Sequence, residues 1–326
     1  MPSTRRVVLL LTHSGDYYTI DRVAEEVTRR GLLPVRLDTD DFPGKWGLAT
    51  APGDEGWLNT PAGELREREV QAVWLRRLMP PRFDEELEPA YRTSCARESL
   101  ATLEGFLDTL ESSGCRFVNP PAADHLAHNK PRQLRLAREL GLEVPRTLIT
   151  NDAARVRAFF QQVEGGAVTK MLTPLSQSMD GSRPFLYTSE LRAEDLEDLE
   201  GLRYSPMVFQ ERIPKSHELR VVVVGNHCFV GAIDASRSAA GQVDWRRARP
   251  DECSWQAGAL PSGVSTRLVR LVAALGLVYG AVDLIVTPEG RHMFLEVNPG
   301  GEWGMLEKEL GLPIAEALAE ALAESP

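Results

Sequence analysis

The chain lacks the features that mark membrane proteins and disulfide-stabilised secreted proteins. Its longest apolar runs, such as 7–11 and 221–224, fall far short of the roughly 20 residues that a helix needs to cross a bilayer. The first residues contain neither the apolar stretch nor the small-residue cleavage site of a secretory signal peptide. Only four cysteines occur, none with CxxC spacing, which favours reduced thiols over disulfides or a metal site. We therefore expect a cytoplasmic protein without a membrane partner.

Positive charge is also scarce. The chain has 37 Lys and Arg against 47 Asp and Glu, which gives a formal net charge of −10. A surface that binds nucleic acid needs surplus cations to neutralise phosphates, so this balance argues against a general nucleic-acid-binding protein. It leaves room for a nucleotide site, because such a site needs only a few well-placed lysines or arginines.

Several common catalytic motifs are absent as well. The chain contains no Walker A sequence, no GxGxxG and no HExxH. His13-Ser14-Gly15-Asp16 places a histidine, a serine and an aspartate side by side, but adjacency in sequence does not build a catalytic triad. A function must therefore be sought in residues that are spread along the chain.

What the chain contains is a globular composition, and its 43% hydrophobic residues exclude a disordered chain. An apolar run over 7–12, helical spacing over 20–30 and another apolar run over 32–37 predict a β-α-β start and a mixed α/β fold with an open sheet. Breaks at Asn119-Pro120 and near Pro206 divide the rest. We expect three units, with bounds at 1–120, 121–205 and 206–326.

The sharpest constellation of polar residues lies near the C-terminus. Asp283 lies in one predicted strand, and Glu296 and Asn298 lie in the next. Alternate residues of a strand share a face, so Glu296 and Asn298 point the same way and Asp283 can face them. Three oxygen ligands on one face suit Mg²⁺. The alternative is a strand with solvent-facing polar residues, but Pro299-Gly300-Gly301 and the apolar surroundings of Glu296 favour the metal site.

Two lysines and one strand end are suited to a nucleotide. Lys130 precedes a predicted helix, and Lys170 ends an apolar strand; each is placed to bind phosphate or, equally, to extend into solvent. The segment 207–214 is an apolar strand that turns polar, as expected of an interdomain hinge whose backbone contacts adenine. Glu218 and Arg220 share a strand face and suit ribose and phosphate, although a surface ion pair is the common alternative.

The ordered set of these residues resembles the ATP-grasp superfamily, and the chain is similar to the peptide maturases that make microviridins and other graspetides. The residues that carry the superfamily resemblance are Lys130, Lys170, Gln210-Glu211, Glu218, Arg220, Asp283 and Glu296-Val297-Asn298. The segments that carry the similarity to the maturases are 9–16, 19–23, 36–40, Trp74-Leu75-Arg76-Arg77, Asn119-Pro120, Asn129-Lys130, 231–234 and 244–246. The resemblance implies an ATP-grasp fold with an N-terminal pre-ATP-grasp domain, a central domain and a C-terminal domain.

The resemblance also implies a reaction. ATP would phosphorylate a side-chain carboxylate of a ribosomal precursor peptide, and a Ser/Thr hydroxyl or Lys amine of that peptide would close an ω-ester or ω-amide ring, with release of ADP and phosphate. The alternatives are an intermolecular carboxylate-amine ligase of the glutamate-adding type and a regulatory ATP-binding module without catalysis. The expected partners are the leader and core of the precursor, and a homodimer is common for this architecture.

Roles for individual residues follow from the resemblance. The nucleotide-binding residues are expected to be Lys130, Lys170, Gln210, Glu211, Arg212, Ile213 and Glu218. Two Mg²⁺ ions are expected at Asp283, Glu296 and Asn298. The residues expected to steady the acyl phosphate and the oxyanion are Arg220, Arg237 and Arg246, with Asp234 and Asp244 orienting these arginines or assisting proton removal. An exposed ion-pair network is the alternative for Arg237, Asp244 and Arg246.

Two further segments carry weaker signals. The polar loop 175–182 has the composition to cover phosphates through its N–H groups, but it has a single glycine, unlike many ATP-grasp enzymes. A strongly acidic segment follows it. We expect a solvated helix face there, or alternatively a dock for a basic leader helix, formed by Glu190, Glu194, Asp195, Glu197, Asp198 and Glu200.

Overall fold

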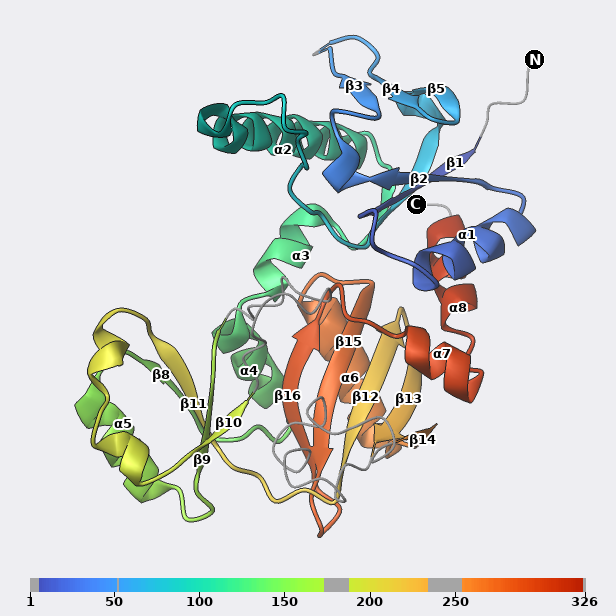
Figure 1. Cartoon of the computed structure of the whole chain (residues 1–326). Coiled ribbons are helices and arrows are strands. Elements are labelled where there is room, and N and C mark those ends of the chain that lie inside the picture. Colours follow the sequence, from blue (N-terminus) through green and yellow to red (C-terminus); the bar gives the residue numbers. More distant parts are fainter. Residues whose placement is uncertain (1–5, 52, 173–187, 234–253, 325–326) are drawn as a thin grey trace.

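A computed structural model of the chain describes residues 6–51, 53–172, 188–233 and 254–324. Figure 1 shows three groups of elements: an N-terminal group above, a C-terminal sheet below it and a smaller central group beside that sheet. The last helix, α8 (Ile314–Ala323), returns to pack against α1 (Thr19–Arg29) of the N-terminal group. The N-terminal and C-terminal groups are thereby joined through one shared hydrophobic core.

The N-terminal group is built on a parallel sheet in the order β2-β1-β6-β7. Its strands are β1 (Val7–Thr12), β2 (Leu33–Asp38), β6 (Val70–Leu75) and β7 (Arg116–Val118). β1 is buried along its whole length because both faces of the sheet are covered. Val8 and Leu10 face α1 and α8, whereas Leu9 and Leu11 face α2 (Pro89–Ser112).

A small antiparallel sheet covers the α2 side of the N-terminal group. It consists of β3 (Gly47–Ala49), β4 (Trp57–Thr60) and β5 (Gly63–Arg66), in that order. The sequence predicts the hairpin of β3 and β4 but not β5, because Leu65 is the one apolar side chain in that strand. Two short 3₁₀ helices flank these strands, η1 (Thr39–Asp41) and η2 (Glu67–Glu69).

The C-terminal sheet has five antiparallel strands in the order β14-β13-β12-β15-β16. They are β12 (His217–Val224), β13 (His227–Ile233), β14 (Trp255–Ala257), β15 (Tyr279–Val286) and β16 (His292–Asn298). One face packs on α3 (Pro121–Ala127), α4 (Lys130–Glu139) and α6 (Ser262–Ala274) through an apolar core that contains Leu219, Val221 and Val223. On the other face, Val222 and Val224 pack in the core shared with α7 (Gly304–Leu310) and α8.

The central group is an antiparallel sheet with one helix against it. The strand order is β10-β9-β11-β8, and the strands are β8 (Thr147–Thr150), β9 (Ala167–Lys170), β10 (Ser189–Leu191) and β11 (Met207–Glu211). α5 (Ala153–Gln162) is capped by Asp152, whose side chain accepts hydrogen bonds from the backbone N–H groups of Ala154 and Arg155. Val156, Phe159 and Phe209 form a separate small core between the helix and the sheet.

Sheet membership does not follow the chain order of the expected units. β11 lies after residue 205 but pairs with β8 and β9 of the central sheet. Conversely, α3 and α4 lie after residue 120 but pack on the C-terminal sheet. The bounds 1–120, 121–205 and 206–326 stay a prediction, and a sheet-based division places these elements differently. The sequence also did not predict α3, α7 or β14, which are all short.

Two findings concern the membrane-spanning helices and disulfide bonds that the sequence was predicted to lack. No helix in the described ranges is both long and apolar enough to span a membrane. Of the four cysteines, Cys95, Cys115 and Cys228 are free thiols, and Cys253 lies outside the described residues. Burial raises the pKa of Cys115 to about 12, so that thiol is protonated and unreactive at neutral pH.

Candidate functional site

The predicted trio of oxygen donors lies on one face of the C-terminal sheet. Asp283 of β15 is paired directly with Glu296 of β16, and Ala281 is paired with Asn298. The Asn298 Nδ2 atom donates a hydrogen bond to Glu296 Oε1 at 3.2 Å. This contact confirms the predicted shared face of Glu296 and Asn298. Their role as metal ligands stays a prediction.

Each carboxylate of this trio faces a cation. Lys130, the first residue of α4, has its Nζ atom 2.7 Å from Glu296 Oε2. Arg220 lies directly opposite Asp283 in the β12–β15 pair, and its Nε atom is 2.8 Å from Asp283 Oδ1. The sequence predicts that Lys130 and Arg220 share one phosphate-binding site, and the structure places both on the same pair of carboxylates. We call Lys130, Arg220, Asp283, Glu296 and Asn298 the carboxylate face.

The electrostatics of Glu296 show how closely cations surround it. Burial acts to raise the pKa of Glu296, but the charges of Lys130 and Lys170 and hydrogen bonds from Lys130 and Asn298 outweigh it. The pKa is therefore held well below its usual value of 4.5, and the carboxylate is ionised at neutral pH. Lys170 of β9 thus acts on the same carboxylate as Lys130, from a different sheet.

The donor set fits Mg²⁺ only together with a substrate. Within the described ranges there is no group of three or more His, Cys, Asp or Glu that could hold a metal ion. Two carboxylates and one amide oxygen are too few for a cage made of protein alone. They match the way Mg²⁺ binds, through one or two carboxylates together with substrate phosphates. The nearby lysines supply the remaining charge that phosphates require.

Two buried amide side chains fix the backbone beside these donors. β16 is an edge strand, so the backbone of Val297 has no further strand to pair with on its outer side. Gln133 of α4 replaces that strand: its Nε2 donates to the Val297 carbonyl at 2.7 Å, and its Oε1 accepts from the Val297 N–H at 2.9 Å. Val297 lies between Glu296 and Asn298, so Gln133 fixes both donors.

Asn119 does the same for the loop 299–302 that follows. Its Nδ2 donates to the carbonyls of Tyr279 and Pro299, and its Oδ1 accepts from the N–H groups of Val278 and Tyr279, all within 3.1 Å. Asn119 is 1% exposed, so these four bonds satisfy every donor and acceptor of a group that water does not reach. The Tyr279 hydroxyl in turn donates to the Gly301 carbonyl.

The N-terminal group reaches the same loop through Arg76 at the end of β6. The guanidinium is buried, donates to the Gly300 carbonyl and pairs with Glu302, while its Nε lies 3.8 Å from Asp16. Glycine is required here, because a Cβ on Gly301 would lie 2.4 Å from the Cβ of Ala281. In the sequence, Arg76 and Asn119 belong to the segments that are similar to the peptide maturases, but no role is predicted for them. No feature of the sequence identifies Gln133 or Tyr279 as important.

The hinge residues have mostly structural side chains. Gln210 is 4% exposed and donates to Thr147 Oγ1 at 3.0 Å. The Glu211 carboxylate accepts from the Arg146 N–H at 3.1 Å, and Arg212 pairs with Glu190 at 2.9 Å. Most of the backbone N–H groups are engaged as well, since that of Glu211 donates to the Arg146 carbonyl at 2.9 Å and that of Arg212 to the Gly166 carbonyl at 3.0 Å. The backbone N–H of Ile213 donates to no described residue, and its predicted contact with adenine stays a prediction.

Other predicted residues lie nearby or outside the described ranges. Glu218 lies two residues before Arg220 on the same face of β12, and its carboxylate pairs with Lys215. The residues that lie outside the described ranges are Asp234, Arg237, Asp244, Arg246 and the loop 175–182. Their predicted roles stay predictions.

The acidic segment 190–200 does not form the helix that the sequence predicts. Its six carboxylates are exposed, but they lie on β10, on the 3₁₀ helices η3 (Glu194–Leu196) and η4 (Glu200–Arg203) and in the turn between them. The predicted solvated helix face is therefore wrong in its secondary structure. Pairs with Arg212 and, at 3.1 Å, between Arg192 and Glu194 also reduce the negative charge of this surface.

Comparison with known proteins now places the chain. Residues 7–125 match the family model described as the MvdD pre-ATP grasp domain, and residues 127–322 match the RimK-like ATP-grasp domain. No match was found among curated protein sequences. Solved structures, in contrast, match over nearly the whole chain.

Three of these structures illustrate the similarity. Macrocyclase MdnB from Microcystis aeruginosa MRC is 47% identical, with a TM-score of 0.82, and the match covers 98% of this chain and 99% of that one. Macrocyclase MdnC from the same organism, bound with precursor peptide MdnA, is 33% identical, with a TM-score of 0.86 and coverage of 98% and 100%. A RiPP-associated ATP-grasp ligase from Chryseobacterium gregarium, in complex with ADP and a leader and core peptide, is 29% identical, with a TM-score of 0.88 and coverage of 97% and 96%.

The family models match 7–125 and 127–322, and the second alone covers more than half of the chain. The carboxylate face and its cations all lie within the second match. The chain therefore belongs to the RimK-like ATP-grasp family of ligases and carries a pre-ATP-grasp domain of the MvdD type before it.

Proposed function

We propose that the chain is an ATP-dependent peptide macrocyclase. It would join Asp or Glu side-chain carboxylates of a ribosomal precursor peptide to Ser/Thr hydroxyls or Lys amines of the same peptide. The observation that carries this proposal is similarity over the whole length to two macrocyclases and a RiPP-associated ligase, including the N-terminal domain. The carboxylate face supports it, because it combines ionised carboxylates with cations suited to phosphates.

The nucleotide would lie between the central and C-terminal sheets. Lys130 and Lys170 would hold its phosphates, since both already act on the carboxylate of Glu296. The backbone at 211–213 would hold adenine, and Glu218 would bind ribose. Asp283, Glu296 and Asn298 would hold two Mg²⁺ ions, which neutralise phosphate charge and align the groups for in-line transfer.

The reaction would have two steps. A peptide carboxylate oxygen attacks the γ-phosphorus of ATP, ADP leaves, and a mixed anhydride, the acyl phosphate, forms. The hydroxyl or amine of the acceptor then attacks the acyl carbon and loses its proton, and the C–O bond to phosphate breaks. Arg220 would stabilise the charge on the transferred phosphate and the oxyanion. Arg237, Arg246, Asp234 and Asp244 are proposed to assist at the same centre.

Mass spectrometry tests the function directly. The substrate to be sought is a short Ser/Thr- and Asp/Glu-rich peptide encoded by an open reading frame beside this gene, and it is incubated with the enzyme, ATP and Mg²⁺. The expected result is the loss of one water per ring, with one ADP formed per ring. Mild alkali then distinguishes the products, because it cleaves an ester ring and leaves an amide ring closed. ADP formation without any change in peptide mass would contradict ring formation.

An intermolecular ligase of the glutamate-adding type is the second candidate. The match to the RimK-like model favours it over other enzyme classes. It shares the nucleotide site and differs in the acceptor, so the peptide would gain the mass of an added amino acid less one water. Assaying the peptide with and without free glutamate separates the two candidates. We further propose a cytoplasmic homodimer, which light scattering of the purified chain tests for its assembly state.

A further inference from the structure

The carboxyl edge of the N-terminal sheet has the geometry of a ligand site. From β1 the chain proceeds to β2 on one side, and β6 lies on the other side of β1. The strand order therefore reverses between β1 and β6, and both strands are parallel. In open α/β sheets, ligands bind outside the carboxyl ends of the strands at such a reversal. The residues after β1 and after β6, His13 to Asp16 and Arg76-Arg77, border this position.

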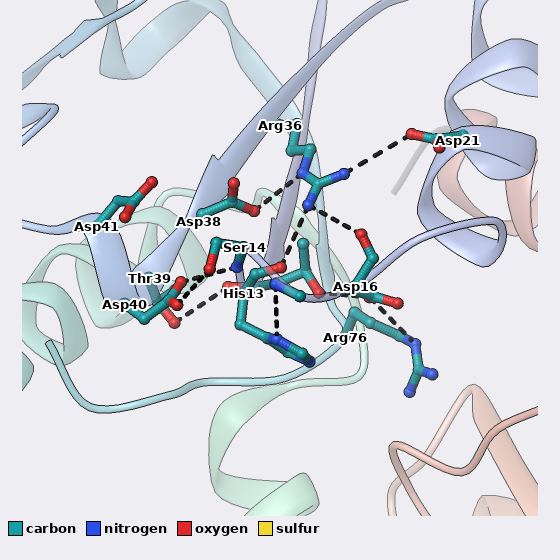
Figure 2. A network of polar contacts seen from close by, with 12 residues as sticks. His13, Ser14, Asp16, Asp21, Arg36, Asp38, Thr39, Asp40, Asp41 and Arg76 are labelled. Atoms are coloured by element: carbon teal, nitrogen blue, oxygen red, sulfur yellow. Dashed lines mark hydrogen bonds and ion pairs between the residues drawn. The ribbon is translucent and has the colours of Figure 1, made fainter. Parts of the chain in front are cut away.

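The acidic side chains at this edge are already saturated. Figure 2 shows the network: Asp40 accepts hydrogen bonds from the N–H and hydroxyl of Ser14 at 2.8 and 2.7 Å. Asp40 also pairs with Arg82 at 3.1 Å. Asp16 accepts a hydrogen bond from the Thr12 hydroxyl and lies near Arg76. These carboxylates are engaged with the protein itself, which argues against a cation site here.

Arg77 is the cation that this network does not engage. Its backbone N–H donates to the Leu11 carbonyl at 3.3 Å, which fixes Arg77 at the end of the β1–β6 pair. Arg77 is an exposed residue, and within the described ranges its guanidinium makes no hydrogen bond and no ion pair. Partial desolvation and the charge of Arg76 lower the pKa of Arg77, and Asp16, Glu302 and Tyr279 act against this. The loop 299–302 is contacted by the preceding residue, Arg76, through Gly300 and Glu302.

His13 supplies a neutral donor beside it. The ring Nδ1 accepts a hydrogen bond from the Gly15 N–H at 3.2 Å, which places the proton of the neutral ring on Nε2. Burial lowers the pKa of His13, against the opposing charge of Asp16, and Arg77 lowers it further. The ring is thus neutral at pH 7. His13 directly follows β1, and the Arg77 N–H donates to the Leu11 carbonyl of that strand, so both residues lie at the same edge of the sheet. In Figure 2 the ring lies apart from the Asp38, Asp40 and Asp41 side chains.

We propose that Arg77 and His13 form a carboxylate-binding site at the β1–β6 edge, which holds an acidic side chain of the peptide substrate. This inference rests on the proposed function and adds a substrate contact from the N-terminal domain. One guanidinium and one neutral N–H match a single negative charge, and a guanidinium binds a carboxylate through two parallel hydrogen bonds. Arg76, the neighbour of Arg77, contacts Gly300 and Glu302, so the site lies beside the loop that follows Asn298.

The first test measures binding without turnover. Side-chain NMR of ¹⁵N-histidine follows His13, assigned with His13→Gln, while the full chain is titrated with glutarate, with neutral glutaramide or with inorganic phosphate. The expected result is a saturable shift of the His13 resonance with glutarate and none with glutaramide. Arg77→Gln should weaken glutarate binding about tenfold or more, because a charge-assisted hydrogen bond is lost.

A matched control arginine lies at the same edge. Arg82 is also exposed, but it is already paired with Asp40 and Asp41. Arg82→Gln should therefore leave glutarate binding within about twofold of the unaltered chain. Phosphate shifting His13 more strongly than glutarate, or equal glutarate binding by Arg77→Gln and the unaltered chain, overturns the carboxylate site.

The second test uses the precursor peptide once ring formation has been shown. Arg77→Gln should raise KM for the peptide about tenfold and leave KM for ATP within about twofold, with Arg77→Lys intermediate because it loses the planar fork. Glutarate binding that depends on Arg77, together with failed ring formation, keeps this site and removes the macrocyclase. Ring formation with a normal peptide KM in Arg77→Gln removes this site and keeps the macrocyclase.

Discussion

The carboxyl edge of the N-terminal sheet and the carboxylate face of the C-terminal sheet both combine acids with arginines or lysines. At the N-terminal edge, Asp40 accepts two hydrogen bonds from Ser14 and forms an ion pair with Arg82. Its charge therefore holds neighbouring loops together. On the carboxylate face, Glu296 contacts Lys130 of α4 and Asn298 of its own strand, and Lys170 of the central sheet acts on it as well. The same residue types thus serve structure in one place and are poised for a ligand in the other.

The physical difference lies in what surrounds the charges. The loops of the N-terminal edge satisfy their carboxylates with backbone and hydroxyl groups of the same unit. The carboxylate face instead has cations from α4 and β9 converging on one carboxylate of β16. A phosphate chain that enters between these sheets would replace carboxylate–lysine contacts by phosphate–lysine contacts.

The largest expected effect comes from breaking the carboxylate face. Glu296→Gln or Glu296→Ala, and likewise Asp283→Ala, should reduce ADP formation at least about a hundredfold, because a charged ligand for phosphate-bound Mg²⁺ is lost. Thermal unfolding should show that each variant is still folded. The matched control is Glu143→Gln, which removes an exposed pair with Arg291 and should keep full activity. Unaltered rates in Glu296→Gln would contradict the metal assignment.

The next effect concerns the amides that fix these donors. Asn119→Ala or Gln133→Ala should lower the free energy of unfolding by about 2–4 kcal/mol, because buried backbone groups lose their partners. Urea unfolding measures the loss. Arg135→Ala, on the exposed side of α4, removes only a surface pair with Glu139 and should change stability by less than about 0.5 kcal/mol. If Gln133→Ala lowered the free energy of unfolding no more than Arg135→Ala does, the role of Gln133 in fixing the β16 backbone would be contradicted.

The link between the two regions is the third point of attack. Arg76→Gln should lower kcat roughly ten- to hundredfold, because the loop 299–302 would no longer be held at Gly300 and Glu302. KM for ATP should change less than kcat, since Arg76 contacts the loop and not the proposed phosphate-binding lysines. Steady-state kinetics with varied ATP give both quantities. A change in KM for ATP alone would show that Arg76 acts on the nucleotide.

Low pH should lower the free energy of unfolding, and protonation of Glu296 should account for part of this loss. Its folded pKa is held below the usual 4.5, so its contribution to stability is present above that pH and is lost as the pH falls. One such group adds at most about 1.4 kcal/mol per pH unit to the slope of stability against pH. Unfolding free energies measured between pH 3 and 7 should show a shallower acid slope in Glu296→Gln. An identical slope would contradict the depressed pKa.

The smallest effect is expected at the hinge. Arg212→Ala removes an exposed pair with Glu190 but keeps the backbone that is proposed to contact adenine. Stability should change by less than about 1 kcal/mol, and ATP affinity should stay within about twofold. Calorimetric titration with a non-hydrolysable ATP analogue measures the affinity. A large loss of affinity would show that the Arg212 side chain itself binds nucleotide.

Much of the fold could be predicted because local sequence patterns indicate many of its helices and strands. β1 is one uninterrupted apolar run, and α1 combines helical spacing with an acidic start and a basic end. The elements that were missed are short: β5 contains one apolar residue, and α3 has seven residues. Such segments gain their structure from packing rather than from local propensity.

The residues of the candidate site likewise fall into those that a local sequence pattern identifies and those that it does not. Glu296 and Asn298 could be placed on one face because strand residues alternate, and their hydrogen bond confirms it. Gln133 and Asn119 could not be assigned, because a single glutamine or asparagine in a sequence carries no sign of burial. Gln210 was predicted to bind nucleotide, but its side chain is buried against Thr147 and its backbone lies in a strand that is paired on both sides, which the sequence alone does not reveal.

The sequence alone determined which residue types are available, the strands and helices that carry them, and the family to which the chain belongs. The tertiary structure alone decided which charges meet. Lys130 and Glu296 are separated by half of the chain, and Arg76 and Glu302 by more than two thirds of it, yet each pair is in contact. Hydrophobic burial brings α4 against β16 and α8 against α1, and the polar pairs then form where those packed elements leave them.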